Sequence, residues 1–142
     1  NVLKKIAEDH HPNAMNDYDR EALGVEPERV SAFAVIRKDK DGYLSNIIEK
    51  PNGNELEQVE DENGRVGVSM NIFSFSASQI YSYLKSCPIN PERDEKELPT
   101  AIKNMIAEQP QAMFTIAISD AVPDLTYQED IKKVAAVLNS LE

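Results

Sequence analysis

Cysteine and positive charge are both scarce in this sequence, and each shortage argues against a class of function. Cys87 is the single cysteine, so the chain has no internal disulfide and no metal cage built from several thiolates. We interpret Cys87 as a small buried side chain at a helix end. The 15 Lys and Arg residues are outnumbered by 25 Asp and Glu residues, which gives a formal net charge of -10. This balance argues against a nucleic-acid partner, because phosphate backbones are bound by clustered cations.

Long hydrophobic runs are absent as well. No apolar stretch is long enough to cross a bilayer, and the first residues lack the pattern of an export signal. We therefore expect a soluble, cytoplasmic protein with no membrane contact. A chain of 142 residues, of which 41% are hydrophobic, has room for a single core, so one domain over residues 1–142 is predicted.

The spacing of apolar residues predicts an α/β fold with a mixed sheet flanked by helices. A turn around Gly42 joins two of the strands into a hairpin, and this antiparallel pair makes the sheet mixed. The predicted strands cover residues 13–18, 31–37, 43–49, 66–75 and 112–118, and the predicted helices cover residues 2–8, 76–87, 98–106 and 126–141.

The segments between these elements carry expectations of their own. The acidic stretch from Asn52 to Asn63 is predicted to be a solvated loop, and residues 88–93 are predicted to be irregular. Two helices are expected to begin with capping boxes, Ser76 with Gln79 and Thr126 with Glu129. The last helix has an apolar stripe, which we expect to pack against the rest of the domain.

Glu49 and Lys50 lie at the carboxyl end of the second hairpin strand, which Pro51 terminates. In open α/β sheets, ligands bind outside the carboxyl ends of strands. The two residues are therefore candidate binding groups. The alternative is a surface ion pair at a strand end.

Four segments together resemble the sugar-1-phosphate nucleotidyltransferase family. Ile48-Glu49-Lys50-Pro51 is similar to the family's Glu-Lys-Pro signature, and Val68 to Phe75 resembles the strand that follows it. Asp94 to Pro99 resembles an acidic segment before the next helix, and Pro123 to Ile131 resembles the closing motif that contains an aspartate. The four matches occur in the family order.

The resemblance implies a Rossmann-like enzyme that joins a sugar 1-phosphate to a nucleoside triphosphate, releases pyrophosphate and uses Mg²⁺. Glu49 would accept hydrogen bonds from sugar hydroxyls, and Lys50, as the catalytic residue, would neutralise and orient the attacking phosphate. Ser69 and Asn71 would border the sugar. Asp124 would help to hold Mg²⁺, with helix capping as its alternative role.

The sequence also departs from the family pattern. The glycine-rich loop that wraps the triphosphate has no counterpart, so residues 1–142 are expected to be the sugar-phosphate-binding, C-terminal portion of such a domain, inactive alone and prone to self-association. Asn71 replaces the usual glycine of the sugar strand. A non-catalytic α/β module that binds a sugar phosphate, or serves regulation, is the alternative.

Overall fold

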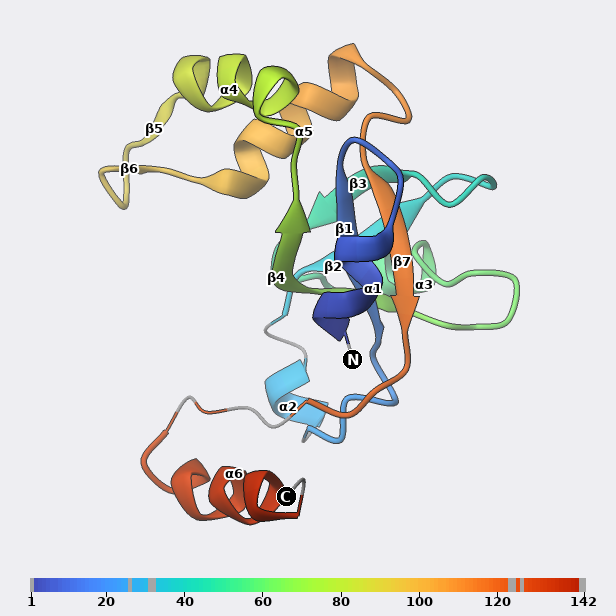
Figure 1. Cartoon of the computed structure of the whole chain (residues 1–142), viewed down its shortest axis with the longest axis vertical. Coiled ribbons are helices and arrows are strands. Elements are labelled where there is room, and N and C mark those ends of the chain that lie inside the picture. Colours follow the sequence, from blue (N-terminus) through green and yellow to red (C-terminus); the bar gives the residue numbers. More distant parts are fainter. Residues whose placement is uncertain (1, 26, 31–32, 123–124, 126, 141–142) are drawn as a thin grey trace.

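A computed structural model describes all residues of the chain except 1, 26, 31–32, 123–124, 126 and 141–142 (Figure 1). Helices are interleaved with strands along the described residues, as expected for an α/β fold. The helices are α1 (Val2–Glu8), α2 (Pro27–Val30), α3 (Gly53–Glu57), α4 (Ala77–Ser86), α5 (Leu98–Glu108) and α6 (Asp130–Asn139). The strands are β1 (Ala14–Asp19), β2 (Val35–Lys38), β3 (Leu44–Ile48), β4 (Gly67–Ser74), β5 (Ile89–Asn90), β6 (Glu95–Lys96) and β7 (Phe114–Ile118).

The main sheet of the described residues has five strands in the order β3-β2-β4-β1-β7. β1 and β7 are parallel, whereas β4 is antiparallel to both β1 and β2, and β2 is antiparallel to β3. The sheet is therefore mixed and flanked by helices, which confirms the predicted fold class. The predicted hairpin is confirmed as β2 and β3.

The β2-β3 hairpin curls so that its tip reaches the beginning of β7. At the tip, Gly42 has a φ of 85°, a backbone conformation that glycine adopts without a steric penalty. The Leu44 N–H donates to the Met113 carbonyl at 2.8 Å, and the Thr115 N–H donates to the Gly42 carbonyl at 3.0 Å. These bonds join the two edges of the sheet at one end, while β3 stays an edge strand along the rest of its length.

Each face of the sheet buries its own hydrophobic cluster, as the alternation of side chains along a strand requires. Met15 and Ile36 lie in the cluster that α4 and α5 cover, and Tyr18 and Val35 lie in the cluster on the opposite face. Cys87 is buried in the first cluster, at the end of α4, which confirms the structural interpretation of that cysteine. The helices on the first face therefore have fixed positions relative to β3.

A bulge in β4 places Asn71 in an unusual conformation. Met15 pairs with Phe73, but Asp17 pairs with Ser69, so β4 has more residues than β1 over this interval. Asn71 takes up this excess with a φ of 57°, which is in the left-handed region. Asn tolerates this region better than most residues do, so the backbone explains why Asn can stand where the resembled family has glycine.

The acidic stretch between Asn52 and Asn63 is not simply a loop, and that prediction was wrong. It begins with α3, which has a complete capping box: the Glu55 N–H donates to Asn52 Oδ1 at 3.0 Å, and the Asn52 N–H donates to Glu55 Oε2 at 2.9 Å. The two apolar residues of the stretch, Leu56 and Val59, pack against the second cluster. Burial of Val59 and partial burial of Leu56 favour this packed arrangement over a solvated loop, despite the acidic neighbours.

The region after α4 is also more regular than predicted. Residues 89–90, which lie in the segment 88–93 that was predicted to be irregular, pair with residues 95–96 in a short antiparallel hairpin of β5 and β6. The predicted capping box at α4 is wrong: the helix begins where expected, but Ser76 makes no capping bond through its side chain, and Gln79 instead accepts a hydrogen bond from Asn13 Nδ2 at 2.6 Å.

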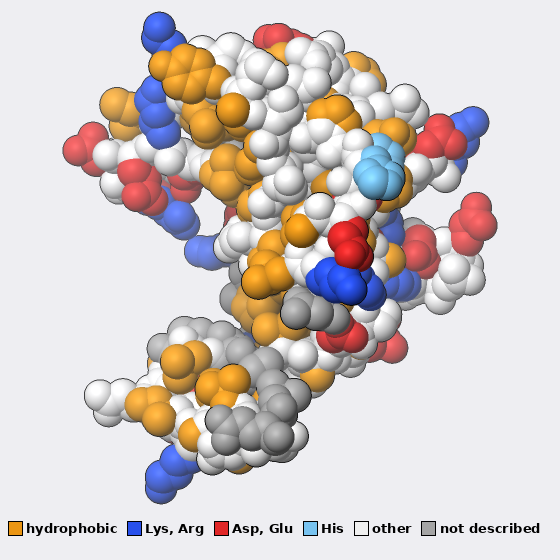
Figure 2. Space-filling model, in the orientation of Figure 1, with side chains coloured by type: hydrophobic (Ala, Val, Ile, Leu, Met, Phe, Trp, Pro, Cys, Tyr) orange, Lys and Arg blue, Asp and Glu red, His pale blue; other side chains and the backbone are white. Residues whose placement is uncertain are grey.

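The last helix does not pack its apolar stripe against the sheet, so that prediction was also wrong. α6 lies apart from the sheet, and Figure 2 shows hydrophobic side chains exposed on it. Ile131 and Leu138 are 55% and 56% exposed. Its first turn is connected to α2, because Arg29 forms a bidentate ion pair with buried Asp130 at 2.8 and 3.0 Å. Thr126, which the predicted capping box requires, is outside the described residues.

Within the part of the chain that the structure describes, no helix is both long and apolar enough to cross a bilayer.

Candidate functional site

Glu49 follows the last residue of β3 and is solvent-exposed. Among the described residues, its carboxylate has no hydrogen-bond donor and no ion-pair partner, so the predicted alternative of a surface ion pair with Lys50 is absent there. Glu49 lines a cavity of about 470 Å³. An unpaired carboxylate on a concave surface is available to a ligand.

Lys50 is also exposed, and its backbone has a φ of 47°. This left-handed conformation costs a residue with a Cβ about 1–2 kcal/mol. The chain turns sharply here, immediately before Pro51. Lys50 is not among the residues that line the Glu49 cavity.

Ser69 and Asn71 lie on β4, two strands away from β3. On β2, Val35 pairs with Ile48 of β3 on one side and with Val68 of β4 on the other. Glu49 and Ser69, the next residues after Ile48 and Val68, therefore lie at the same level of the sheet, on either side of the chain that leads into β2. Strand spacing puts their backbones about 10 Å apart. Ser69 is buried, its N–H donates to the Ala34 carbonyl at 2.8 Å, and Asn71 is exposed. The structure thus places Glu49 and Ser69 at one level of the sheet, on strands that β2 separates, and Asn71 lies two residues beyond Ser69 on β4.

The Glu49 cavity wraps around the exposed edge of β3. Successive strand residues point to opposite faces of a sheet, and the cavity is lined by residues from both faces of β3. Its remaining walls come from β2, from the α3 region and from α5. The full lining consists of Arg37, Asn46, Ile47, Ile48, Glu49, Glu55, Gln58 and Lys103. Sequence reasoning missed Arg37 and Lys103, because neither is close to Glu49 in the chain.

A second polar region surrounds Asp17, which is 1% exposed. Its Oδ2 accepts from Lys38 Nζ and from Arg65 Nη1, each at 2.7 Å, and its carbonyl accepts from Arg65 Nη2 at 2.6 Å. Asp61 and Asp19 lie near the same cations, at 4.0 Å from Lys38 and 3.8 Å from Arg65. Asp17 Oδ1 has no hydrogen-bond partner within the described ranges and lies against Gly67.

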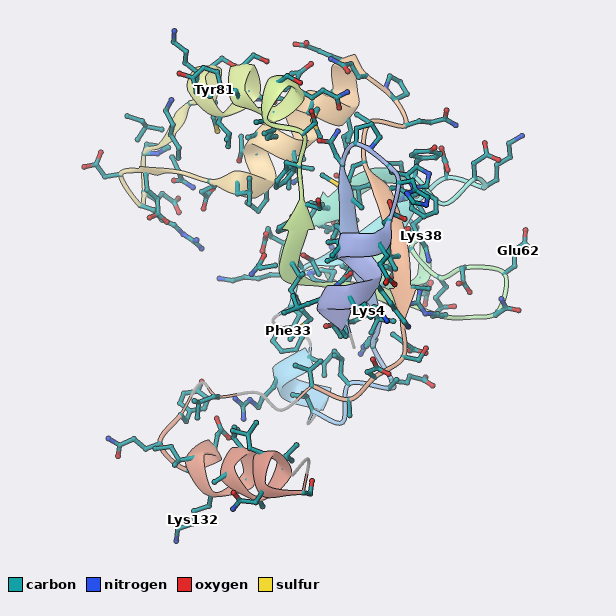
Figure 3. The ribbon with its side chains drawn as sticks, in the orientation of Figure 1. Lys4, Phe33, Lys38, Glu62, Tyr81 and Lys132 are labelled. Atoms are coloured by element: carbon teal, nitrogen blue, oxygen red, sulfur yellow. The ribbon has the colours of Figure 1, made fainter. Side chains whose placement is uncertain are left out.

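This ion cluster forms one wall of a cavity of about 520 Å³ between the hairpin, β7 and the acidic loop. In Figure 3, Lys38 lies against the body of the domain, while Glu62 extends outward at the tip of the loop. Burial disfavours the Asp61 carboxylate, but the backbone N–H groups of Asn63 and Arg65 donate to it and, with the two nearby cations, lower its pKa. The charges of this region are therefore largely satisfied within the protein.

The predicted Mg²⁺ site is not defined by the described residues. Asp124 lies outside them, and within the described ranges no three His, Cys, Asp or Glu side chains are placed to hold a metal ion. The assignment of Asp124 to Mg²⁺ stays a prediction.

Two solved structures have a similar α/β fold. One similar structure is a protein described as a glucose-1-phosphate thymidylyltransferase from Bacillus anthracis, in complex with sucrose: the TM-score is 0.57 and the identity 14%, and the match covers 96% of this chain and 47% of that one. Another is a CMP:2-keto-3-deoxy-manno-octonic acid synthetase in complex with CTP, with a TM-score of 0.54, 14% identity, and coverage of 99% and 55%.

The chain therefore spans about half the length of these two solved structures. No protein-family model matches its sequence. At 14% identity the comparisons establish the α/β fold, which agrees with the fold that the sequence motifs implied.

Proposed function

We propose that the chain forms the sugar-phosphate-binding part of a nucleotidyltransferase, which condenses a sugar 1-phosphate with a nucleoside triphosphate. In this reaction an oxygen of the sugar phosphate attacks the α-phosphorus of the triphosphate. A new phosphorus–oxygen bond forms, the bond to the β-phosphate oxygen breaks, and pyrophosphate leaves. No protein nucleophile is needed, so the protein contributes positioning and charge neutralisation.

The observation that carries the proposal is the unpaired Glu49 carboxylate on a cavity of about 470 Å³, at the carboxyl end of a strand. This volume lies in the usual range for small-molecule sites. The similar structures add support, because one is described as a glucose-1-phosphate thymidylyltransferase and the other is a CMP:2-keto-3-deoxy-manno-octonic acid synthetase in complex with CTP. The Glu-Lys-Pro sequence at positions 49–51 adds independent support.

Each residue then has a role that its chemistry allows. Glu49 accepts hydrogen bonds from sugar hydroxyls, and Lys50 supplies positive charge at the rim of the site. Ser69 and Asn71 border the sugar from β4, where the bulge exposes the Asn71 side chain. Mg²⁺, when bound, would neutralise phosphate charge, and Asp124 is the residue proposed to help hold it.

The triphosphate would be bound by residues outside this sequence, since the chain spans about half of the similar structures. We therefore propose that residues 1–142 bind a sugar phosphate but do not turn it over alone.

Nuclear magnetic resonance tests the proposal directly. Glucose 1-phosphate added at millimolar concentration to the ¹⁵N-labelled chain is expected to shift the amide signals of Glu49 and Lys50, with smaller shifts at Ser69 and Asn71. The matched ligand control is sodium sulfate at equal ionic strength. Unchanged Glu49 and Lys50 signals, or the same shifts with sulfate, would refute the sugar-phosphate assignment.

A further inference from the structure

Three polar groups on the Glu49 cavity lack partners within the described part of the chain. They are the Glu49 carboxylate, the Lys103 ammonium group and Arg37 Nε. Polar groups in folded proteins are usually satisfied when they are shielded from water, and a shielded group without a partner costs about 1–3 kcal/mol. Only Arg37 Nε is shielded in this way, since Glu49 and Lys103 are exposed to water. All three residues, from three different elements, line one concave surface. That convergence points to a ligand.

Arg37 supplies the most informative of these groups. Its Nη2 donates to Gln58 Oε1 at 3.1 Å, so the guanidinium group is fixed against the α3 region. Its Nε is shielded from solvent and has no acceptor among the described residues. Arg37 lines the Glu49 cavity and also the cavity next to Asp17. The directed N–H donors of a guanidinium group match the oxygens of a phosphate.

Lys103 reaches the same cavity from α5. This helix is fixed because Ala101, Ile102 and Met105 are fully buried in the first hydrophobic cluster. Lys103 is exposed on the other side of the helix. Its charge is therefore held beside the β3 edge without an ion pair from the described residues, although the chain has an excess of acids.

The two carboxylates on the cavity differ in their availability. Glu55 Oε2 accepts from the Asn52 N–H in the capping box of α3, so this carboxylate has a structural partner. Glu49 has none within the described ranges. Because β3 is an edge strand, its outward N–H and C=O groups are also open to hydroxyl groups. The groups that suit sugar hydroxyls are therefore Glu49 and the edge of β3, whereas Arg37 and Lys103 suit an anion.

We infer that Arg37 and Lys103 bind the phosphate group of a phosphorylated sugar whose hydroxyls contact Glu49 and the edge of β3. The inference rests on the proposed function and refines it, because the cations on this cavity are Arg37 and Lys103, whereas Lys50 is outside its lining. Arg37 and Lys103 are ligand-binding residues that the Glu-Lys-Pro motif does not indicate.

Affinity measurements on variants test the inference. The dissociation constant of glucose 1-phosphate is measured by titration calorimetry for the unmodified chain and for Lys103→Gln, Arg37→Lys and Lys50→Gln, with Lys132→Gln on α6 as the matched control. Loss of a charge-assisted bond to phosphate is expected to weaken binding by about tenfold or more in Lys103→Gln.

The other variants are expected to have smaller effects. Arg37→Lys keeps the charge but loses the directed donors, so we expect an intermediate loss of affinity. Lys50→Gln is expected to change affinity less than Lys103→Gln, and Lys132→Gln is expected to leave it unchanged.

The failures of the two proposals can be told apart. If glucose 1-phosphate binds and shifts the Glu49 amide, but Lys103→Gln and Arg37→Lys bind it as well as the unmodified chain does, the inference is overturned and the proposed function stands. If the unmodified chain does not bind glucose 1-phosphate at all, both are overturned. Circular dichroism spectra of the variants verify that each is folded.

Discussion

The Asp17 cluster and the Glu49 cavity both combine acids with Arg and Lys, yet their charges are arranged in opposite ways. Asp17 is 1% exposed, and Lys38 and Arg65 contact one of its oxygens at 2.7 Å. Glu49 and Lys103 share a cavity but form no ion pair with each other. The first arrangement joins β1, β2 and the segment before β4. The second arrangement leaves the charges of Glu49 and Lys103 available to a ligand.

This difference shows that a cluster of charged residues does not by itself identify a binding site. A buried acid that is paired with two cations is a structural element, and removing it leaves the cations uncompensated. Exposed charges without partners add little to stability, so their position beside a cavity calls for another explanation. Substitutions in the two regions are therefore expected to affect different properties of the protein.

The largest effect is expected for Asp17→Ala. Breaking this buried ion pair should reduce the free energy of unfolding by about 3–5 kcal/mol, because Lys38 and Arg65 lose their shared carboxylate. The comparison variant is Glu49→Gln, which should change stability by less than about 0.5 kcal/mol. Urea denaturation measures both. Similar losses in the two variants would remove the distinction between the two regions.

Gly67→Ala tests how tightly the Asp17 cluster is packed. A Cβ at position 67 would clash with Asp17 Oδ1 and lie 2.9 Å from Ile36 Cγ1, so the buried carboxylate would have to move. We expect a loss of about 3 kcal/mol. Gly53→Ala is the matched control, since a Cβ there has no neighbour within 4 Å, and it should be neutral or slightly stabilising. Equal melting temperatures for the two variants would contradict this packing.

Asn71→Ala should cost about 1 kcal/mol, because alanine tolerates the left-handed conformation at this bulge less well than asparagine does. Asn71→Gly should be close to neutral. Thermal unfolding of the pair distinguishes a backbone effect from a side-chain effect. A larger loss for glycine than for alanine would show that the asparagine side chain, rather than its backbone conformation, supports the strand.

The smallest effect concerns Asp61, whose pKa is lower in the folded chain than its ordinary value of 3.8. A lowered folded pKa contributes stability above the unfolded pKa, and this contribution disappears as the pH falls through the folded value. The free energy of unfolding of Asp61→Asn should therefore fall less than that of the unmodified chain as the pH drops below about 4, and the difference should be less than about 1 kcal/mol. Denaturation midpoints measured from pH 6 down to pH 2.5 test this. The same pH dependence at low pH in Asp61→Asn and in the unmodified chain would contradict the role of Asp61.

Much of the fold could be predicted from the sequence, because local patterns determine it. The apolar run of residues 31–37 and the turn at Gly42 indicated the β2-β3 hairpin, and Pro88 indicated the end of α4. α3 was missed because its acidic composition masked the signal of Asn52 followed three residues later by Glu55. The exposure of α6 could not be predicted, because an apolar stripe does not reveal whether a partner surface covers it.

The candidate site could be predicted only in part. The Glu-Lys-Pro motif indicated Glu49, which the structure places on a cavity, but it did not indicate Arg37 and Lys103. These two cations reach the cavity from β2 and α5, through contacts between segments that are distant in sequence. The Asp17 cluster was missed for the same reason, since Lys38 and Arg65 are 21 and 48 residues away from Asp17.

A crystal structure of the chain with glucose 1-phosphate would show whether the ligand binds at the edge of β3. We expect the sugar in the cavity beside Glu49, with its phosphate within hydrogen-bond distance of Lys103 and Arg37. A ligand bound instead in the cavity next to Asp17, with the Glu49 cavity empty, would contradict this expectation.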